Sequence, residues 1–206
     1  MLSRRGFRRY EEWSRWAMVT GLGWVIAMVF TLTLYFYLSR ILPPVLALIP
    51  ALYAGGVAVT VSQTTILRRG TRRSNWLWVG GLGWGLAILA ATPMLRFLGP
   101  VFGWVAGGLV GGLVFGWSQS YGLWQRERLL FEWTGLTILG WILAFAIGST
   151  LARDLGVETS QLGPVEVAAA ASLGWGFISL LGFALYLLVF SAFSRGESDL
   201  TSGWRD

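Results

Sequence analysis

Two glutamines lie inside long apolar stretches, where side-chain polar groups are uncommon. Gln63 is nineteen residues past Pro44 and Gln119 is nineteen residues past Pro100. A serine precedes each of them: Ser62 and Ser118. An unpaired amide is costly in hydrocarbon, so both glutamines are predicted to point into a helix bundle and find partners there. They could serve as polar links between helices or contact a ligand or solute, and these serines would belong to the same polar site.

Three residue types that support much of enzyme chemistry are absent. The chain has no His and no Cys, and all sixteen of its basic residues are Arg. It therefore lacks the lysine for a Schiff base and the usual ligands for haem, zinc and iron–sulfur clusters. No nucleophile–base pair and no carboxylate deep in an apolar stretch is apparent either. The sequence predicts a protein that is not an enzyme, with no metal site and no cofactor.

Tryptophan recurs within a repeated segment of the form W-x5-L-G-W-x-[IL]-A. The three copies begin 60 and 57 residues apart, at Trp16, Trp76 and Trp133. Such spacing predicts a threefold internal repeat. The inner tryptophans of the segments are Trp24, Trp84 and Trp141. Their indoles are predicted to fill the wedge beside closely packed helices, with an aromatic-lined cavity as the alternative, whereas Trp76 and other tryptophans at helix ends are expected in the head-group layer.

The composition indicates a membrane protein. Of the 206 residues, 55% are apolar and only 13% are charged, and the mean hydropathy is +0.61. A typical soluble domain carries about 25% charged residues. Six stretches have the roughly 20 apolar residues that cross a bilayer. They are approximately 16–38, 42–67, 75–95, 99–124, 130–151 and 164–191.

Arginine sets the expected orientation. Thirteen of the sixteen arginines fall in the two tails and in the turns at 68–74 and 125–129. The positive-inside rule therefore places both termini in the cytoplasm, with a basic tail over 1–15 and another tail over 193–206. The expected location is a bacterial inner membrane or a thylakoid membrane. Anionic lipid head groups are the expected partners of eight arginines: Arg4, Arg5, Arg8, Arg9, Arg68, Arg69, Arg72 and Arg73.

The fold predicted from these features is an all-α integral membrane protein with six transmembrane helices arranged as three repeated helical hairpins. The transmembrane domain spans 16–192, and its repeats cover 16–70, 75–128 and 130–192. A stripe of small residues at every fourth position is expected to face a neighbouring helix in each of the first five stretches. The fourth, which has a second stripe at Gly108, Gly112 and Gly116, is expected to be central. The sixth departs from the pattern, with Trp175 and Phe183 at the positions of glycine and glutamine.

One resemblance adds to this description. The run Gln63-Thr64-Thr65-Ile66-Leu67-Arg68-Arg69, followed by Trp76 and Gly83-Trp84, resembles uncharacterised multi-pass membrane proteins of cyanobacteria and other bacteria. Those proteins have repeated glutamine-containing hairpins that end in Leu-Arg-Arg, and the resemblance implies no activity. Mitochondrial carriers are similar only in layout, because their Pro-x-Asp/Glu-x-x-Lys/Arg signature is missing here.

The first functional hypothesis is a non-catalytic membrane protein: a scaffold, an accessory subunit or an assembly factor. It predicts a membrane-protein partner and no nucleic acid, because topology and anionic lipid account for the positive charge. The alternative is a transporter of a small solute or lipid with its path along the repeat axis. A binder of pigment or quinone is a third hypothesis, since aromatic residues make up 15% of the chain.

Overall fold

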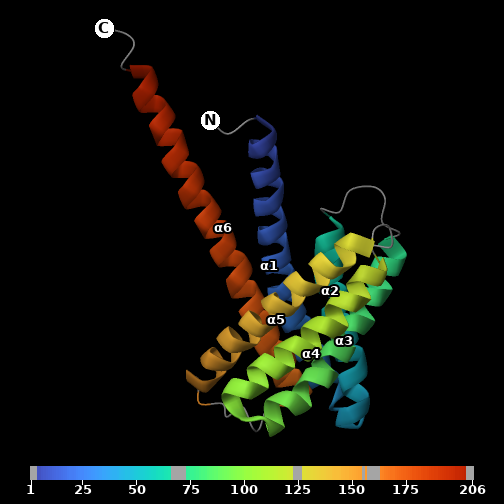
Figure 1. Ribbon diagram of the computed structural model, residues 1–206. Helices are drawn as coiled ribbons and strands as arrows, with labels where there is room; N and C mark the ends of the chain where they lie inside the picture. Colours follow the sequence, from blue (N-terminus) through green and yellow to red (C-terminus); the bar gives the residue numbers. More distant parts are fainter. Residues whose placement is uncertain (1–3, 66–72, 123–126, 155, 157–162, 203–206) are drawn as a thin grey trace.

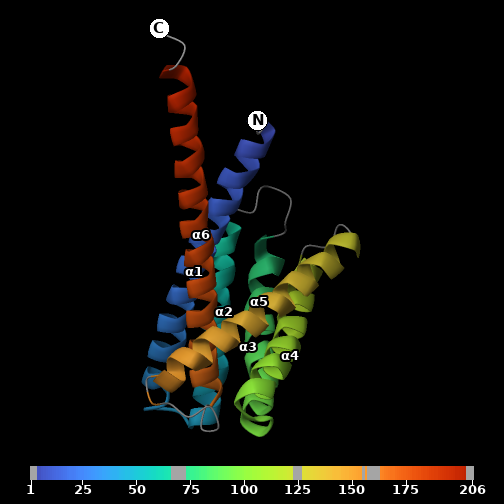
Figure 2. The same cartoon turned by 60° about the vertical axis from the view of Figure 1, so that its left-hand side comes forward.

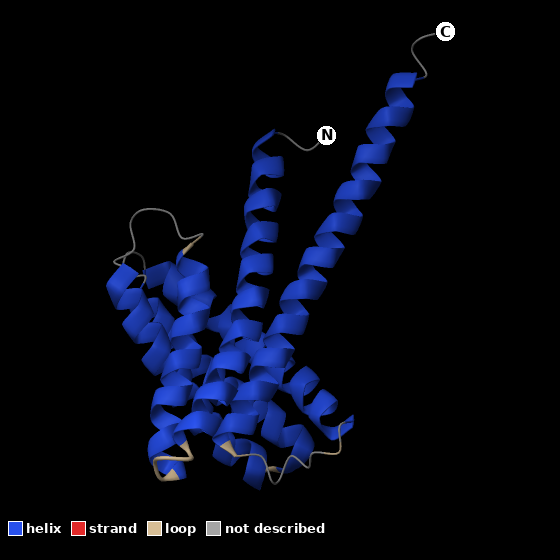
Figure 3. Ribbon diagram, turned by 180° about the vertical axis from the view of Figure 1, so that it is seen from behind, coloured by secondary structure: helices blue, strands red, loops and turns tan. Residues whose placement is uncertain are grey.

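The computed structural model describes residues 4–65, 73–122, 127–154, 156 and 163–202. These residues form six α-helices and no strand, as Figure 1 and Figure 3 show. The helices are α1 (Arg4–Leu38), α2 (Pro44–Thr64), α3 (Arg73–Phe97), α4 (Gly99–Gly122), α5 (Glu127–Asp154) and α6 (Pro164–Ser202). The prediction of an all-helical protein is confirmed.

Within the described residues, five of the helices are long and apolar enough to cross a membrane. Their apolar stretches are Ala17–Leu38, Pro44–Thr64, Asn75–Phe97, Thr134–Leu151 and Pro164–Leu185. The molecule is thus built as an integral membrane protein with several membrane-spanning helices.

The helices pack in the order of the chain. Each helix contacts the next one, and α6 also packs against α1, so that the six form a closed ring. Figure 2 shows α6 running alongside α1, while α3 and α4 lie on the other side of the molecule. In addition, α6 contacts α2 and α3 across the interior of the ring.

This arrangement corrects the prediction that the fourth helix is central. Among the described residues, α4 packs only against α3 and α5, so it lies on the periphery, and α6 has the most helical neighbours. The glycines of α4 do permit close approach of other helices, but the helices that approach are its two neighbours in the sequence, α3 and α5. Gly103 lies against Leu95 of α3, whereas Gly108 and Gly112 lie against Ile142 and Ile138 of α5.

Proline and glycine define the ends of several helices. Pro44 occupies the first turn of α2, where the missing N–H is not needed and the fixed φ already suits a helix. Gly99 has a φ of 74°, a left-handed conformation that allows α4 to begin immediately after α3 ends at Phe97. Gly156, with a φ of 80°, follows the end of α5 in the same way.

The first and last helices are longer than the apolar stretches predicted to cross the bilayer. α1 begins at Arg4 and α6 continues to Ser202, whereas those stretches were expected over 16–38 and 164–191. No proline interrupts either extension, and the helices therefore continue past the apolar stretches. Both extensions project from the same side of the bundle, as Figure 1 shows.

Residues 4–15 of the predicted tail thus belong to α1. Of the predicted head-group contacts, Arg68, Arg69 and Arg72 lie outside the described residues. The structure describes only the backbone of the other five.

The predicted stripes of small residues lie inside the bundle. On α2 the stripe consists of Ala47, Ala51, Gly55, Val59 and Gln63, all of them buried. The corresponding α4 residues are Gly103, Gly107, Gly111, Phe115 and Gln119, and they are buried as well. The interior side of each helix therefore follows the fourfold spacing of the sequence.

Candidate functional site at the bundle axis

Gln63 and Gln119 meet inside the bundle. The Gln119 amide nitrogen Nε2 donates a hydrogen bond of 3.2 Å to Gln63 Oε1. The two side chains are 4% and 2% exposed, so the bond is shielded from solvent. α2 and α4 do not pack against each other. The amide pair therefore links two helices across the ring.

The serines beside these glutamines donate hydrogen bonds within their own helices. Ser62 Oγ donates to the Val59 carbonyl oxygen at 2.6 Å, and Ser118 Oγ donates to the Phe115 carbonyl oxygen at 2.7 Å. Each hydroxyl hydrogen is thus satisfied within its own helix. Each serine faces a glycine of the preceding helix, Gly23 for Ser62 and Gly83 for Ser118, where a Cβ would collide with the hydroxyl.

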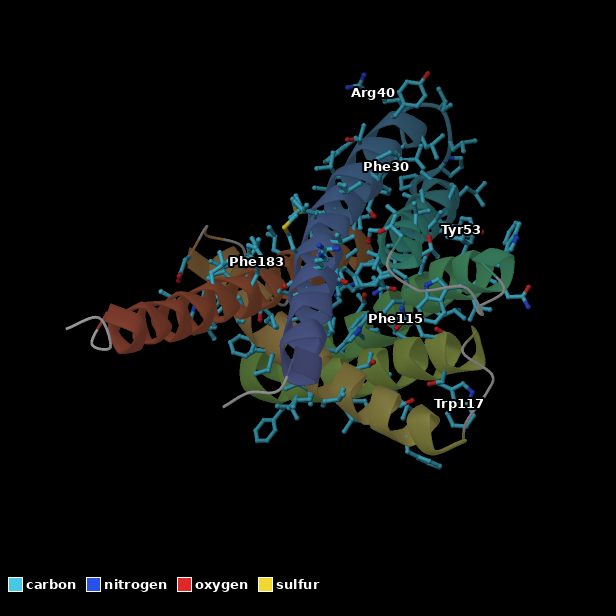
Figure 4. All side chains as sticks on the ribbon, turned by 90° about the horizontal axis from the view of Figure 1, so that it is seen from above. Phe30, Arg40, Tyr53, Phe115, Trp117 and Phe183 are labelled. Carbon is cyan, nitrogen blue, oxygen red and sulfur yellow. The ribbon has the colours of Figure 1, made fainter. Side chains whose placement is uncertain are left out.

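The three repeat tryptophans come together in the interior of the bundle. The ring centroids of Trp24 and Trp84 are 4.8 Å apart, and those of Trp84 and Trp141 are 5.3 Å apart. Phe115, four residues before Gln119, lies within 6.1 Å of all three. Figure 4 shows Phe115 among the helices when the molecule is seen from above.

Trp175 of α6 completes this group. Its ring stacks on Trp24 with centroids 5.6 Å apart and an interplanar angle of 8°. We call Trp24, Trp84, Trp141, Trp175 and Phe115 the axial cluster. No role for Trp175 in this cluster was predicted from the sequence, although the triplet Leu173-Gly174-Trp175 has the same order as the repeat motif.

Glycines on the even helices make room for two of these indoles. Trp84 lies against Gly55 of α2, and Trp141 lies against Gly111 of α4. At the matching position of α6, eleven residues past the helix-opening proline, the residue is Trp175. On α6 an indole therefore occupies the position at which α2 and α4 have glycine. This indole stacks on Trp24.

The axial cluster is packed without polar partners. The indole nitrogens of Trp24, Trp84, Trp141 and Trp175 are buried, and none of them makes a hydrogen bond within the described residues. Thr31 Oγ1 is also buried and makes no hydrogen bond within the described residues. It lies beside Gly55 together with Trp84 Nε1, so a donor and an acceptor face the same small space. An unsatisfied buried donor costs roughly 1–3 kcal/mol, which the aromatic packing must offset.

Two further contacts were not predicted from the sequence. Ser120 and Thr134 form a hydroxyl–hydroxyl hydrogen bond of 3.2 Å between α4 and α5. Trp76, near the beginning of α3, is only 2% exposed, so its indole packs against other residues of the bundle. The depth of Trp76 in the head-group layer stays a prediction.

The site combines a shielded amide pair with a layer of aromatic rings in contact. Comparison with known proteins adds nothing to this description: the chain matches no protein-family model, no curated protein and no solved structure. The likeness to glutamine-containing bacterial membrane proteins stays a prediction, and functional conclusions rest on the geometry described above.

Proposed function

We propose that this protein is a non-catalytic membrane scaffold, accessory subunit or assembly factor. The axial cluster carries the proposal. At its centre, Trp24, Trp84 and Trp141 are at most 1% exposed and Phe115 is 2% exposed. Aromatic rings in van der Waals contact leave no path for a solute at this depth. The outward faces of the helices, rich in exposed leucine and phenylalanine, are then the surfaces through which the protein acts.

The proposal includes all six helices crossing a bacterial inner membrane or a thylakoid membrane, with both termini cytoplasmic. Arginine distribution supports this orientation, and the common side on which α1 begins and α6 ends agrees with it. α4 belongs to the set because its 24 residues match the length of the neighbouring spans and it packs between two of them. Anionic lipid head groups are the proposed contacts of the cytoplasmic arginines.

We further propose that the ring consists of three related hairpins. Equivalent contacts between successive hairpins support this relation. Gly56 of α2 lies against Gly81, Gly112 of α4 lies against Ile138, and Gly176 of α6 lies near the Gly21 carbonyl oxygen. Each of the three glycines is twelve residues past its proline, and each partner immediately precedes a Leu-Gly-Trp triplet. Parallel repeats of this kind are related by an axis along the membrane normal.

The amide pair favours a second candidate, a transporter of a small solute or lipid. A buried pair of glutamines on the axis is the kind of polar group that a solute could contact. This candidate requires the axial cluster to separate during transport, because the rings block the axis.

Photo-crosslinking in native-lipid particles tests the scaffold proposal. A photoreactive amino acid replaces Phe177, which is 52% exposed on α6, and Phe102 of α4, which is 75% exposed, provides the comparison. We expect one stoichiometric membrane-protein adduct from at least one of these positions. A monomer without adducts from either face would contradict the proposal. Solute uptake by reconstituted vesicles, lost in Gln63→Leu and Gln119→Leu, would support the transporter instead.

A further inference from the structure

The first hairpin holds a buried hydroxyl beside a buried indole donor of the next helix. Thr31 Oγ1 of α1 and Trp84 Nε1 of α3 both border the place that a Cβ atom on Gly55 would take. Trp84 Nε1 is 3.3 Å from that place, and Thr31 Oγ1 is closer. Both residues are at most 1% exposed, and neither atom has a hydrogen-bond partner in the part of the chain that the structure describes. Because water does not reach them, each atom needs a partner from the protein itself.

A backbone acceptor lies at the same place. The Ala27 carbonyl oxygen is 3.3 Å from the Cβ position of Gly55, and Ala27 is four residues before Thr31. A threonine hydroxyl in a helix commonly donates to the carbonyl oxygen four residues earlier. Three other threonines of this protein do so: Thr60, Thr92 and Thr150. A short chain of hydrogen bonds, from the indole N–H to the hydroxyl and from the hydroxyl to this carbonyl, would therefore satisfy both buried side chains.

The second hairpin provides a comparison within the same molecule. Gly111 of α4 is the repeat equivalent of Gly55, and the place of its Cβ atom is 2.6 and 2.7 Å from the ring carbons Cε3 and Cζ3 of Trp141. Thr31 comes seven residues after the inner tryptophan of its repeat, and the equivalent residue in the second repeat is Ala91. The indole therefore presents its nitrogen to the glycine where a hydroxyl is available, and ring carbons where there is none.

A bond between these side chains would join two helices that are not neighbours. Among the described residues, α1 packs only against α2 and α6. Trp84 is also the ring of the axial cluster that contacts both Trp24 and Trp141. Because a hydrogen bond is directional, a bond at Nε1 would fix the angle at which this indole lies across the axis.

We propose that Thr31 is a latch of the axial cluster: its hydroxyl accepts a hydrogen bond from Trp84 Nε1, donates to the Ala27 carbonyl oxygen and so holds the indole across the bundle axis. Breaking this bond frees the ring to turn, which is the first step in separating the cluster. The inference depends on the fold and not on the proposed function.

The indole N–H signals of protein labelled with ¹⁵N-tryptophan in lipid nanodiscs test the latch. A hydrogen-bonded indole nitrogen resonates downfield of a free one, and the ring currents of neighbouring indoles affect its shift little. Trp141 is the internal reference, because its repeat has no hydroxyl at the equivalent position. Trp84→Phe and Trp141→Phe assign the two signals. In the wild-type protein we expect the Trp84 nitrogen downfield of the Trp141 nitrogen.

Three variants locate the acceptor. Thr31→Val removes the hydroxyl and is expected to shift the Trp84 nitrogen upfield and to speed deuterium exchange of its N–H roughly three- to twentyfold, the range that interhelical hydrogen bonds in membranes provide. Thr31→Ser keeps a hydroxyl and should restore the wild-type signal. Thr92→Val is the matched control, since it removes a buried hydroxyl that donates within α3 to the Ile88 carbonyl oxygen. It should leave the Trp84 signal unchanged.

A Trp84 nitrogen at or upfield of the Trp141 nitrogen in the wild-type protein would overturn the proposal, whether or not the variants fold. An unchanged Trp84 signal in Thr31→Val would overturn it as well, because the acceptor would then lie elsewhere. Equal shifts in Thr31→Val and Thr92→Val would have the same consequence, since the effect would follow from the loss of any buried hydroxyl.

Discussion

The hydrogen bond between Gln63 and Gln119 joins two helices whose backbones are not neighbours. α2 and α4 are separated by α3, and these long side chains reach across to each other. In a membrane such a bond is stabilising mainly because the alternative is an unpaired amide in hydrocarbon. At the residue scale, the pair therefore fixes the relative rotation of the two helices about the axis.

We predict that removing one glutamine costs more than half of what removing both costs. Interhelical hydrogen bonds in membrane proteins contribute about 0.6 kcal/mol on average and up to about 1.7 kcal/mol. Gln63→Leu leaves the Gln119 amide without this acceptor, whereas the double variant Gln63→Leu/Gln119→Leu removes both groups. Unfolding free energies in lipid bicelles, analysed as a double-mutant cycle, measure the difference. Strict additivity of the two substitutions would show that the bond contributes nothing.

At the scale of the helix, close approach depends on particular glycines. A Cβ on Gly112 would stand 2.5 Å from the Ile138 Cα atom of α5, a contact with backbone that no rotamer change relieves. Gly135 of α5, in contrast, has no neighbouring atom within 4 Å of such a Cβ. The two positions therefore separate a glycine required by packing from one that is not.

We predict opposite effects of alanine at these positions. Gly112→Ala forces α4 and α5 apart and is expected to lower the unfolding free energy by about 1–3 kcal/mol. Gly135→Ala is expected to be neutral or to stabilise by up to about 1 kcal/mol, because alanine favours helix without a new contact. Thermal unfolding of the two variants side by side measures the contrast. Equal effects would mean that the α4–α5 contact is not as close as described.

Sequence periodicity predicted which face of each helix is buried, but not which helix lies beside which. The stripe ending at Gln63 is buried as expected, because fourfold spacing depends on helix geometry alone. The peripheral position of α4 and the place of Trp175 depend on how the faces of neighbouring helices fit together. The spacing of residues along one helix gives no information about that fit. Trp175 departs from the glycine pattern, and this departure is what brings a fourth indole to the axis.

At the scale of the whole molecule, the contact between α6 and α1 closes the ring. Gly21 of α1 faces Ser179 of α6, and a Cβ on Gly21 would stand 2.9 Å from the Ser179 Cβ atom. This separation is slightly below the roughly 3.5–4.5 Å between Cβ atoms in disulfides, so a small shift of α6 brings a cysteine pair into range.

We predict that the variant Gly21→Cys/Ser179→Cys forms an intramolecular disulfide under mild oxidation. The natural chain has no cysteine, so no other thiol of the chain can form a disulfide. Gly21→Cys/Val105→Cys is the control, because α1 and α4 do not pack together. Electrophoretic mobility before and after reduction reports the bond. Failure of the first pair to crosslink, or equal crosslinking of both pairs, would contradict the closed ring.

The central claim is that the bundle axis is closed by packed side chains, and thiol accessibility tests it most directly. Ala87 of α3 is 0% exposed within the core that includes the axial cluster, whereas Arg40 is exposed in the turn after α1. In vesicles permeabilised so that both faces are reached, a water-soluble maleimide should modify Arg40→Cys rapidly and Ala87→Cys only after denaturation. Comparable rates for the two variants would reveal a water-filled axis and contradict the account.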